Sequence, residues 1–267
     1  VVVNDGSTDN SLREIKRFHE LTVINNESNQ GVLPSTISAM QLMDTDIVAF
    51  LDGDDRWHED KIELIHDVFD RSPDVMMTTH SYQWMDGQGE VLNIRDTTHS
   101  NLERIQHLSN GDPAQMNEFL KESILSYKGV WLGSAFSIRR DALDLSGFAK
   151  WSASMDGNHL SHQDQPLAAF LIKTNPSKRI VYLDKVLFDY RVFGENSSGD
   201  TRSPEKALRT LDRSRATIMR TYDIVRSMAG RSGELAIQAN KLLELDYLAS
   251  LYSGNTLKAV KIFFQLW

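Results

Sequence analysis

Three aspartates within four positions, Asp52, Asp54 and Asp55, directly follow the apolar run 47–51. Carboxylates this close repel one another and raise each other's pKa unless a cation, a hydrogen-bond donor or open water compensates. Mg²⁺ and Mn²⁺ prefer a few carboxylates together with phosphate oxygens and water, and Asp-x-Asp presents such oxygens on one side of a tight turn. The spacing therefore predicts a divalent metal site at Asp52 and Asp54, with a solvated loop as the alternative.

A second acidic loop, Asn-Asp-Gly-Ser-Thr-Asp at residues 4–9, follows the apolar residues 1–3. In parallel α/β sheets, ligands bind at the carboxyl ends of strands, and both loops would lie at such ends. We therefore expect Asp5, Gly6 and Ser7 to lie near the same ligand as Asp52. A turn with a helix N-cap is the alternative, because Asp, Gly, Ser and Thr also suit that role.

The elements that must position these loops alternate between strand and helix over the first 70 residues. A helix is expected to open near Pro34, and another near Glu59 and Asp60, whose charges suit a helix N-terminus. This alternation predicts an α/β fold whose central sheet is mainly parallel, with helices on both faces. The expected strands are residues 1–3, 21–24 and 46–51.

The pattern is looser beyond Pro73, where a hairpin is expected around the turn sequence Asp-Gly-Gln-Gly at residues 86–89. Residues 96–112 are polar and rich in turn formers, and Pro113 is expected to open a helix that runs to Leu125. The remaining expected elements are a strand at 130–138, a helix at 163–172 and one or two strands within 179–192.

A polar break at residues 194–204 separates this part from a tail that is compatible with helix, except for breaks at 230–233 and 253–255. We expect an α/β domain over residues 1–200 and a helical appendage over 201–267.

Composition narrows the classes of function. The net charge of −8 argues against a nucleic-acid partner, which usually requires a basic surface. The absence of cysteine excludes disulfide scaffolds, thiolate zinc sites and a cysteine nucleophile. No apolar stretch reaches the roughly 18 residues of a membrane span, so a cytoplasmic protein is expected. The chain begins on Val1, without methionine and within an expected strand, so we interpret it as a fragment.

The order of three segments, VVVNDGSTDNS, then NQG, then DIVAFLDGDDRW, resembles family 2 of the inverting, nucleotide-sugar-dependent glycosyltransferases, which have the GT-A fold. In that family an Asp-Gly-Ser loop lies against the nucleotide. An Asp-x-Asp motif there holds the ribose and the metal that bridges the diphosphate. The resemblance implies that Asp5 contacts the base, Asp52 the ribose side and Asp54 the metal.

The resemblance continues downstream and covers about residues 1–198. The segments GSAFSIRRDALDLSGF and SHQDQPLAAFLI resemble the region of the family's catalytic acid, which implies that Asp164 is the general base, with Gln163 in place of a more common glutamate. From spacing alone, an aspartate ahead of Pro166 is equally an ordinary helix cap. Family members normally carry one more strand ahead of the Asp-Gly-Ser strand, and this chain begins after it.

The segment VLFDYRVFGENSS resembles the family's closing Tyr-Arg-x-His-x-x-x-Ser segment, with Phe193 where histidine is frequent. Arg191 in this segment is a candidate phosphate ligand, while pairing with a neighbouring aspartate is the alternative.

Together these residues imply transfer of a sugar from a nucleoside diphosphate to an acceptor hydroxyl with inversion, with Mg²⁺ or Mn²⁺ as cofactor. The resemblance implies a saccharide or lipid-linked acceptor in cell-surface polysaccharide or glycolipid synthesis. A positioned base contributes about 10²- to 10⁴-fold to such a reaction, and the metal offsets charge on the leaving group.

Several other side chains are compatible with two roles. Four tryptophans can stack on sugar rings, although buried aromatics are commoner, and two histidines flank the expected base as ligands or as polar loop residues. The tail 257–267 combines two lysines with apolar residues and suits either an anionic membrane or a protein surface. These residues are Trp57, Trp84, Trp131, Trp151, His159, His162, Lys258 and Lys261.

Two competing functions remain open. A Mg²⁺-dependent phosphatase or phosphotransferase would use an aspartate of FLDGDD as nucleophile, but the sequence lacks the Thr or Val expected after a second aspartate at a strand end. A non-catalytic homologue would bind sugar or metal without turnover.

Overall fold

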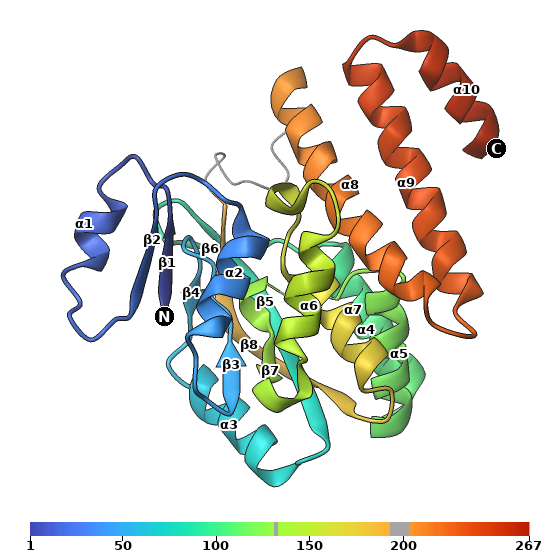
Figure 1. The fold of residues 1–267 in the computed structure, drawn as a ribbon. Helices are drawn as coiled ribbons and strands as arrows, with labels where there is room; N and C mark the ends of the chain where they lie inside the picture. Colours follow the sequence, from blue (N-terminus) through green and yellow to red (C-terminus); the bar gives the residue numbers. More distant parts are fainter. Residues whose placement is uncertain (131–132, 193–202, 267) are drawn as a thin grey trace.

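The computed structural model describes residues 1–130, 133–192 and 203–266, so Trp131, Phe193, Trp267 and the expected boundary at residue 200 lie outside the described residues. Figure 1 shows the strands at the centre and a helical region at one side. The strands are β1 (Val2–Asp5), β2 (Val23–Asn26), β3 (Ile47–Ala49), β4 (Arg56–Trp57), β5 (Val75–Asp86), β6 (Val91–Leu92), β7 (Ser137–Arg139) and β8 (Arg179–Val192). The helices are α1 (Ser11–Ile15), α2 (Val32–Gln41), α3 (Lys61–Arg71), α4 (Thr97–Ser109), α5 (Pro113–Leu125), α6 (Leu145–Ala153), α7 (Asp164–Thr174), α8 (Pro204–Arg226), α9 (Ser232–Tyr252) and α10 (Thr256–Leu266), with short 3-10 turns η1 (Gly133–Ala135), η2 (Arg140–Ala142) and η3 (Asn158–Leu160).

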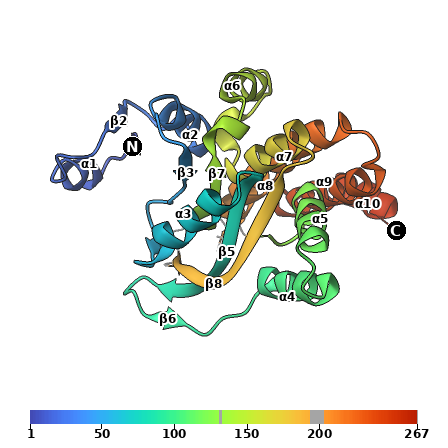
Figure 2. The same ribbon diagram turned by 90° about the horizontal axis from the view of Figure 1, so that it is seen from below.

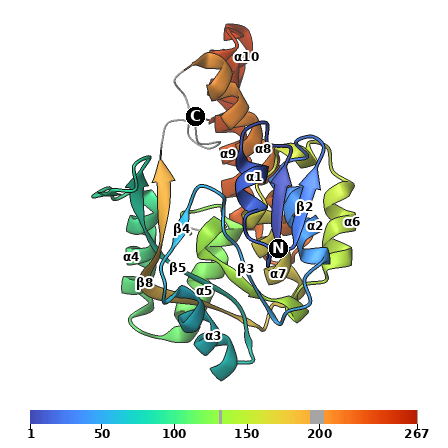
Figure 3. The same cartoon turned by 90° about the vertical axis from the view of Figure 1, so that its left-hand side faces the viewer.

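The strands form two sheets, and the expectation of a mainly parallel sheet is wrong. β1 and β2 form a parallel pair of their own, and the larger sheet has the order β3-β7-β5-β8-β4 with β6 paired to β5. Within it only β5 and β8 run parallel, while the β3/β7, β5/β7, β4/β8 and β5/β6 pairs are antiparallel. The strand–helix alternation of the first 70 residues does not continue, because β7 follows a 3-10 turn and runs opposite to both of its neighbours. Figure 3 shows β1 and β2 beside α2, apart from β5 and β8.

Helices cover both faces of the larger sheet, as expected. Ile65 and Phe69 of α3 pack with Val75 and Val181 on one face. The main core lies on the other face, where α5 and α7 contribute leucines and β8 contributes Ile180. Adjacent residues of β8 thus face opposite layers, as the pleat of a strand requires. Figure 2 shows β5 and β8 side by side between these helices.

Local expectations had mixed outcomes. The hairpin at residues 86–89 is confirmed, since β5 and β6 pair and Gly89 N donates to Asp86 O at 3.1 Å. The helix from Pro113 to Leu125 is confirmed with those bounds. The polar segment 96–112 instead contains α4, whose N-cap Asp96 accepts hydrogen bonds from two backbone amides. The expected strand 130–138 is reduced to β7, which follows η1.

The helices α8, α9 and α10 of the helical region are separated at residues 227–231 and 253–255. The second break is confirmed, while the first lies earlier than the expected 230–233, because α9 begins at Ser232 and includes Gly233. Trp151 Nε1 of α6 donates to Asp223 Oδ2 of α8 at 3.0 Å, which joins this region to the α/β part. None of the helices in the described ranges is both long and apolar enough to span a membrane.

Candidate functional site

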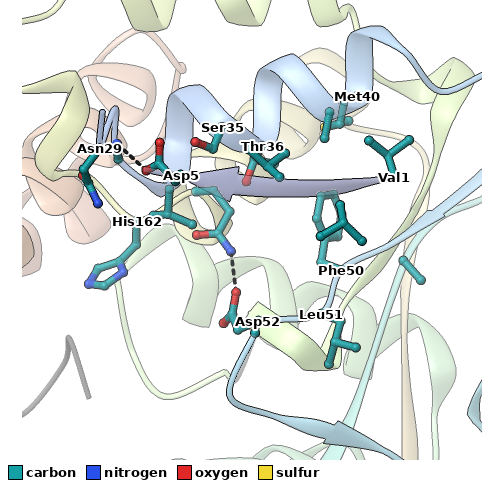
Figure 4. Close-up of a pocket in the computed structure, with 18 of the residues that line it drawn as sticks. Val1, Asp5, Asn29, Ser35, Thr36, Met40, Phe50, Leu51, Asp52 and His162 are labelled. Atoms are coloured by element: carbon teal, nitrogen blue, oxygen red, sulfur yellow. Dashed lines mark hydrogen bonds between the residues drawn. The ribbon is translucent and has the colours of Figure 1, made fainter. Parts of the chain in front are cut away.

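A cavity of about 710 Å³ lies between β1, α2, the loop after β3 and the segment that leads into α7. Figure 4 shows Asp5 and His162 toward one end, Val1, Met40 and Phe50 at the other, and Asp52 and Leu51 along its floor. Asp5, Asp52, Gln163 and Arg213 are among its polar lining residues. The cavity therefore brings together Asp5 of the first acidic loop, Asp52 of the second and Gln163 ahead of α7, while Asp54 and Asp164 are not among its lining residues.

Hydrogen-bond donors just ahead of the N-terminus of α2 fix the carboxylate of Asp5. Its Oδ1 accepts from Gln30 N and Asn26 Nδ2 at 2.8 and 2.7 Å, and its Oδ2 accepts from Gly31 N at 2.8 Å. Burial alone raises the pKa of Asp5, but these hydrogen bonds outweigh it and keep the pKa of the carboxyl below its usual value. Asp5 thus lines the cavity as a permanently ionised group of fixed orientation.

Gly6 and Ser7 are not among the lining residues of the cavity. Gly6 has a φ of +73°, and a Cβ there would lie 2.6 Å from Asn29 N, so the loop needs glycine at this turn. Ser7 is exposed. The alternative role as a helix cap falls to neither residue: Asp9 Oδ1 accepts from Ser11 N, the first residue of α1, at 2.9 Å, and Asn10 makes no side-chain cap. Nucleotide contacts by Gly6 and Ser7 stay predictions.

Asp52 has the most perturbed carboxyl of the acidic loop. Burial, and then repulsion from Asp164, Asp55 and Asp54, raises its pKa to about 7. Gln163 Nε2 donates to Asp52 Oδ1 at 3.4 Å, across 111 positions of the chain. Gln163, which stands where the resembled family more commonly has glutamate, thus supplies a neutral hydrogen-bond donor to a group of carboxylates that repel one another.

Asp55, next to the predicted ligands, is fixed by Ser134, which sequence reasoning did not select. Ser134 Oγ donates to Asp55 Oδ2 at 2.6 Å and accepts from Asp52 N at 2.9 Å. Burial raises the pKa of Asp55 to about 6, although the bond from Ser134 lowers it. This serine lies in the GSAFS segment, where only its family resemblance gave a signal.

The carbonyl of Ser134 has two donors of its own. Trp57 Nε1 donates to it at 3.1 Å, and the fully buried Lys61 Nζ also donates to it, over the Trp57 ring. Burial lowers the pKa of Lys61 to about 7, while Asp55 raises it. Ser134 thus ties the loop 52–57 to the start of α3.

Arg191 of β8 holds the acidic loop from the other side. Its backbone N–H donates to Asp55 Oδ1 at 3.1 Å, and its Nε donates to Asp54 O at 2.8 Å. Its Nη1 reaches the carbonyls of Asp86 and Gly87 at 3.2 and 3.3 Å. These contacts give Arg191 a positioning role, and the predicted phosphate contact stays a prediction.

Asp164 is the first residue of α7, and its Oδ1 accepts from Gln165 N at 2.8 Å. Its carboxylate is close enough to Asp52 to raise the pKa of that group. Asp164 is half-buried rather than fully enclosed, beside the lining residues His162 and Gln163. The helix start therefore places Asp164 next to two lining residues without making it one of them, and its role as the general base stays a prediction.

The acidic loop suits a divalent metal that takes its other ligands from substrate. No group of three or more His, Asp or Glu side chains arranged to hold a metal occurs within the described part of the chain. Mg²⁺ commonly binds through one or two carboxylates plus substrate phosphates and water. The repulsion that raises the pKa of Asp52 would be relieved by such a cation, so Asp54 and Asp52 fit this mode of binding.

Some of the described candidate tryptophans and histidines line the cavity, and the others pack against neighbouring aromatic side chains elsewhere. Trp57, His159 and His162 line the cavity. Trp84 packs edge-on against Tyr190 with ring centroids 5.0 Å apart, and Trp151 packs in the core with Phe148. Among the described tryptophans, only Trp57 lines the cavity.

Comparison with known sequences gives two matches. Residues 1–126 match the model of a family described as glycosyl transferase family 2. An uncharacterized glycosyltransferase of Nostoc sp. is 28% identical over 207 residues, which are 74% of this chain and 56% of that protein. The chain thus spans little more than half the length of this curated relative.

Comparison with solved structures extends the likeness in fold to nearly the whole chain. S. aureus TarS in complex with UDP-GlcNAc has a TM-score of 0.54 and 12% identity, over 98% of this chain and 79% of that one. The mannosyltransferase PcManGT of Pyrobaculum calidifontis, in complex with GDP-Man and Mn²⁺, has a TM-score of 0.52 and 12% identity, over 99% and 72%. The α/β fold with C-terminal helices is therefore shared with both.

Proposed function

We propose, on the premise that residues 1–126 match the model of glycosyl transferase family 2, that this chain is a metal-dependent inverting glycosyltransferase. It moves a sugar from a nucleoside diphosphate to an acceptor hydroxyl. The observation that carries the proposal is the contact between Asp52 and Gln163, 111 positions apart in the chain, at a cavity that Asp5 also lines. This contact supports a joint role for the Asp-x-Asp loop and the start of α7.

The donor side is assigned to the two acidic loops. Asp5 is an ionised acceptor of fixed orientation and suits a base with N–H donors. Asp52 is assigned to the ribose side and to the metal, and Asp54 to the metal. A bound Mg²⁺ or Mn²⁺ would neutralise charge on the departing diphosphate. The UDP-GlcNAc and GDP-Man complexes of the two structural relatives support a nucleotide sugar as donor, and the Mn²⁺ complex supports the metal.

Asp164 is assigned as the general base. Its carboxylate takes the proton of the acceptor hydroxyl while that oxygen attacks the anomeric carbon, and the bond to the diphosphate oxygen breaks on the opposite side. Inversion follows from this single displacement. Asp52 is thus assigned to the side of the departing diphosphate and Asp164 to the side of the attacking hydroxyl. These separate roles account for two carboxylates that lie close enough to repel one another.

The acceptor is proposed to be a saccharide or a lipid-linked saccharide of cell-surface polysaccharide or glycolipid synthesis. α10 packs on the rest of the helical region through Ala259 and Ile262, while Leu257 and Phe264 are 80% and 76% exposed. Lys258 and Lys261 flank these apolar side chains. This face suits the surface of an anionic membrane, and a cytoplasmic location at that surface is part of the proposal.

A screen of UDP- and GDP-sugars for released nucleoside diphosphate tests the proposal, with Mn²⁺, with Mg²⁺ and with a chelator. We expect release with at least one donor, and loss of release with the chelator. A non-catalytic homologue would bind a donor in calorimetric titrations without releasing nucleoside diphosphate. A phosphotransferase would form a phosphoenzyme without any sugar donor, and either result would overturn the proposal.

A further inference from the structure

The helical region contributes a charged side chain to the cavity, although it lies beyond the residues that match the family model. Arg213 of α8 is a lining residue together with Asp5, Asp52 and Gln163. Within the described lining it is the one arginine or lysine, so it provides the cavity's permanent positive charge. Its charge acts on His162, where it helps burial to lower the pKa of the imidazole.

α8 is fixed against the segment that leads into α7. Thr217, which is fully buried, accepts a hydrogen bond from His162 N at 2.9 Å and donates to Arg213 O at 2.9 Å. Arg220, 1% exposed, donates from Nη2 to the carbonyls of Met155 and Asp156 at 3.2 and 3.1 Å. Positions 213, 217 and 220 recur at helical spacing and so share one face of α8. That face holds the segment 155–163 and presents Arg213 to the cavity.

A guanidinium at this position suits a diphosphate. A diphosphate brings several negative charges into a cavity whose fixed carboxylates, Asp5 and Asp52, already repel anions. A single metal offsets only part of that charge. Arginine stays protonated and offers a planar fork that matches two phosphate oxygens. Asp5 does not require this cation, because backbone and amide donors already satisfy both of its oxygens.

We propose that Arg213 is a binding residue for the diphosphate of the nucleotide donor and product, held at the cavity by the contacts of Thr217 and Arg220. This inference rests on the proposed function. It assigns part of the binding site to α8, so that the helical region completes the site and is more than an appendage.

The test is calorimetric titration of the full chain, in excess Mn²⁺, with UDP, GDP, uridine and guanosine. The variants are Arg213→Ala, the charge-retaining Arg213→Lys, and Arg209→Ala as the matched control. Arg209 lies one turn earlier on α8, pairs with Glu205 at 3.3 Å and is not a lining residue. We expect Arg213→Ala to weaken the affinity for whichever nucleoside diphosphate the wild type binds by about 10- to 100-fold, because a hydrogen bond to a charged group is lost. The affinity for the corresponding nucleoside should be unchanged. The affinity of Arg213→Lys for the diphosphate should lie between those of Arg213→Ala and the wild type. The affinity of Arg209→Ala should match that of the wild type.

Unchanged diphosphate affinity in Arg213→Ala would overturn the inference, even if turnover fell, since Arg213 would then act through His162 and Asp164. Equal losses for diphosphate and nucleoside in both Arg213 variants would overturn it as well, because they would indicate a structural role. A wild type that binds neither UDP nor GDP would instead overturn the proposed function, and the inference with it.

Discussion

Ser134 Oγ donates a 2.6 Å hydrogen bond to Asp55 Oδ2, between residues 79 positions apart, and the same oxygen accepts from the backbone of Asp52. A serine from η1 therefore joins Asp52 and Asp55 of the acidic loop. This arrangement keeps carboxylates together that would otherwise separate.

Replacing Ser134 tests whether this contact shapes the site. Ser134→Ala removes the partner of Asp55 Oδ2 and of the Asp52 amide, although Arg191 N still donates to Asp55 Oδ1. We therefore expect the free energy of unfolding to fall by about 1 to 3 kcal/mol and kcat/KM for transfer to fall about tenfold. Ser137→Ala is the control, because Ser137 is also fully buried but its hydroxyl has no hydrogen-bond partner in the described structure. Equal effects of the two substitutions, measured by urea unfolding and donor kinetics, would contradict this role.

Asp52 should reduce the stability of the metal-free protein. Because its pKa is raised to about 7, the folded protein holds a proton that the unfolded chain has released, and stability is lost as the pH rises from about 4 to 7. Asp52→Asn should therefore stabilise the metal-free protein by roughly 1 to 3 kcal/mol at pH 8, and by less at pH 5. Urea unfolding at both pH values checks this. A variant less stable than wild type at pH 8 would show that the repulsion is already compensated.

Lys61 should give the opposite pH dependence. Its pKa is lowered to about 7, so above this pH the unfolded chain binds more protons than the folded one, and stability rises with pH. Between pH 7 and pH 9, the wild type should gain about 1 to 3 kcal/mol of unfolding free energy relative to Lys61→Met. Parallel unfolding curves for the two proteins over this range would mean that Lys61 stays protonated.

Gly31 should not tolerate a side chain. Its φ is +93°, and a Cβ would lie 2.1 Å from the carbonyl oxygen of His159, so Gly31→Ala must separate α2 from η3. We expect a loss of about 2 to 4 kcal/mol and a fall in transfer activity. Gly233→Ala is the control, since nothing lies within 4 Å of that Cβ and the site is in α9. A Gly31→Ala protein as stable as the control would contradict this packing.

Local sequence pattern was sufficient to predict β3, the acidic loop after it and α5. The apolar run before Asp52 predicted β3, and the Asp-x-Asp spacing predicted the acidic loop. Pro113 and the helical periodicity after it predicted α5 with its bounds. These features depend on neighbours in the sequence, so sequence alone contains them.

Long-range contacts were not predictable in the same way. The bond between Ser134 and Asp55, and that between Thr217 and His162, join residues far apart in the chain, and neither residue type is unusual where it stands. The direction of β7 was not predictable for the same reason, because it depends on antiparallel pairing with β3 and β5, which are distant in the sequence. α4 was missed because its polar composition hides a helix that depends on the Asp96 cap and on burial of Leu102 and Ile105.

Release of nucleoside diphosphate by the wild type and by Asp164→Asn, at donor and Mn²⁺ concentrations that saturate both, tests the central claim most directly. Asp164→Asn retains the shape of the side chain but cannot accept the acceptor's proton. We predict that turnover falls about 10²- to 10⁴-fold while donor affinity and the free energy of unfolding do not decrease. Turnover equal to that of the wild type would contradict the assignment of Asp164 as the base of a sugar transfer at this cavity.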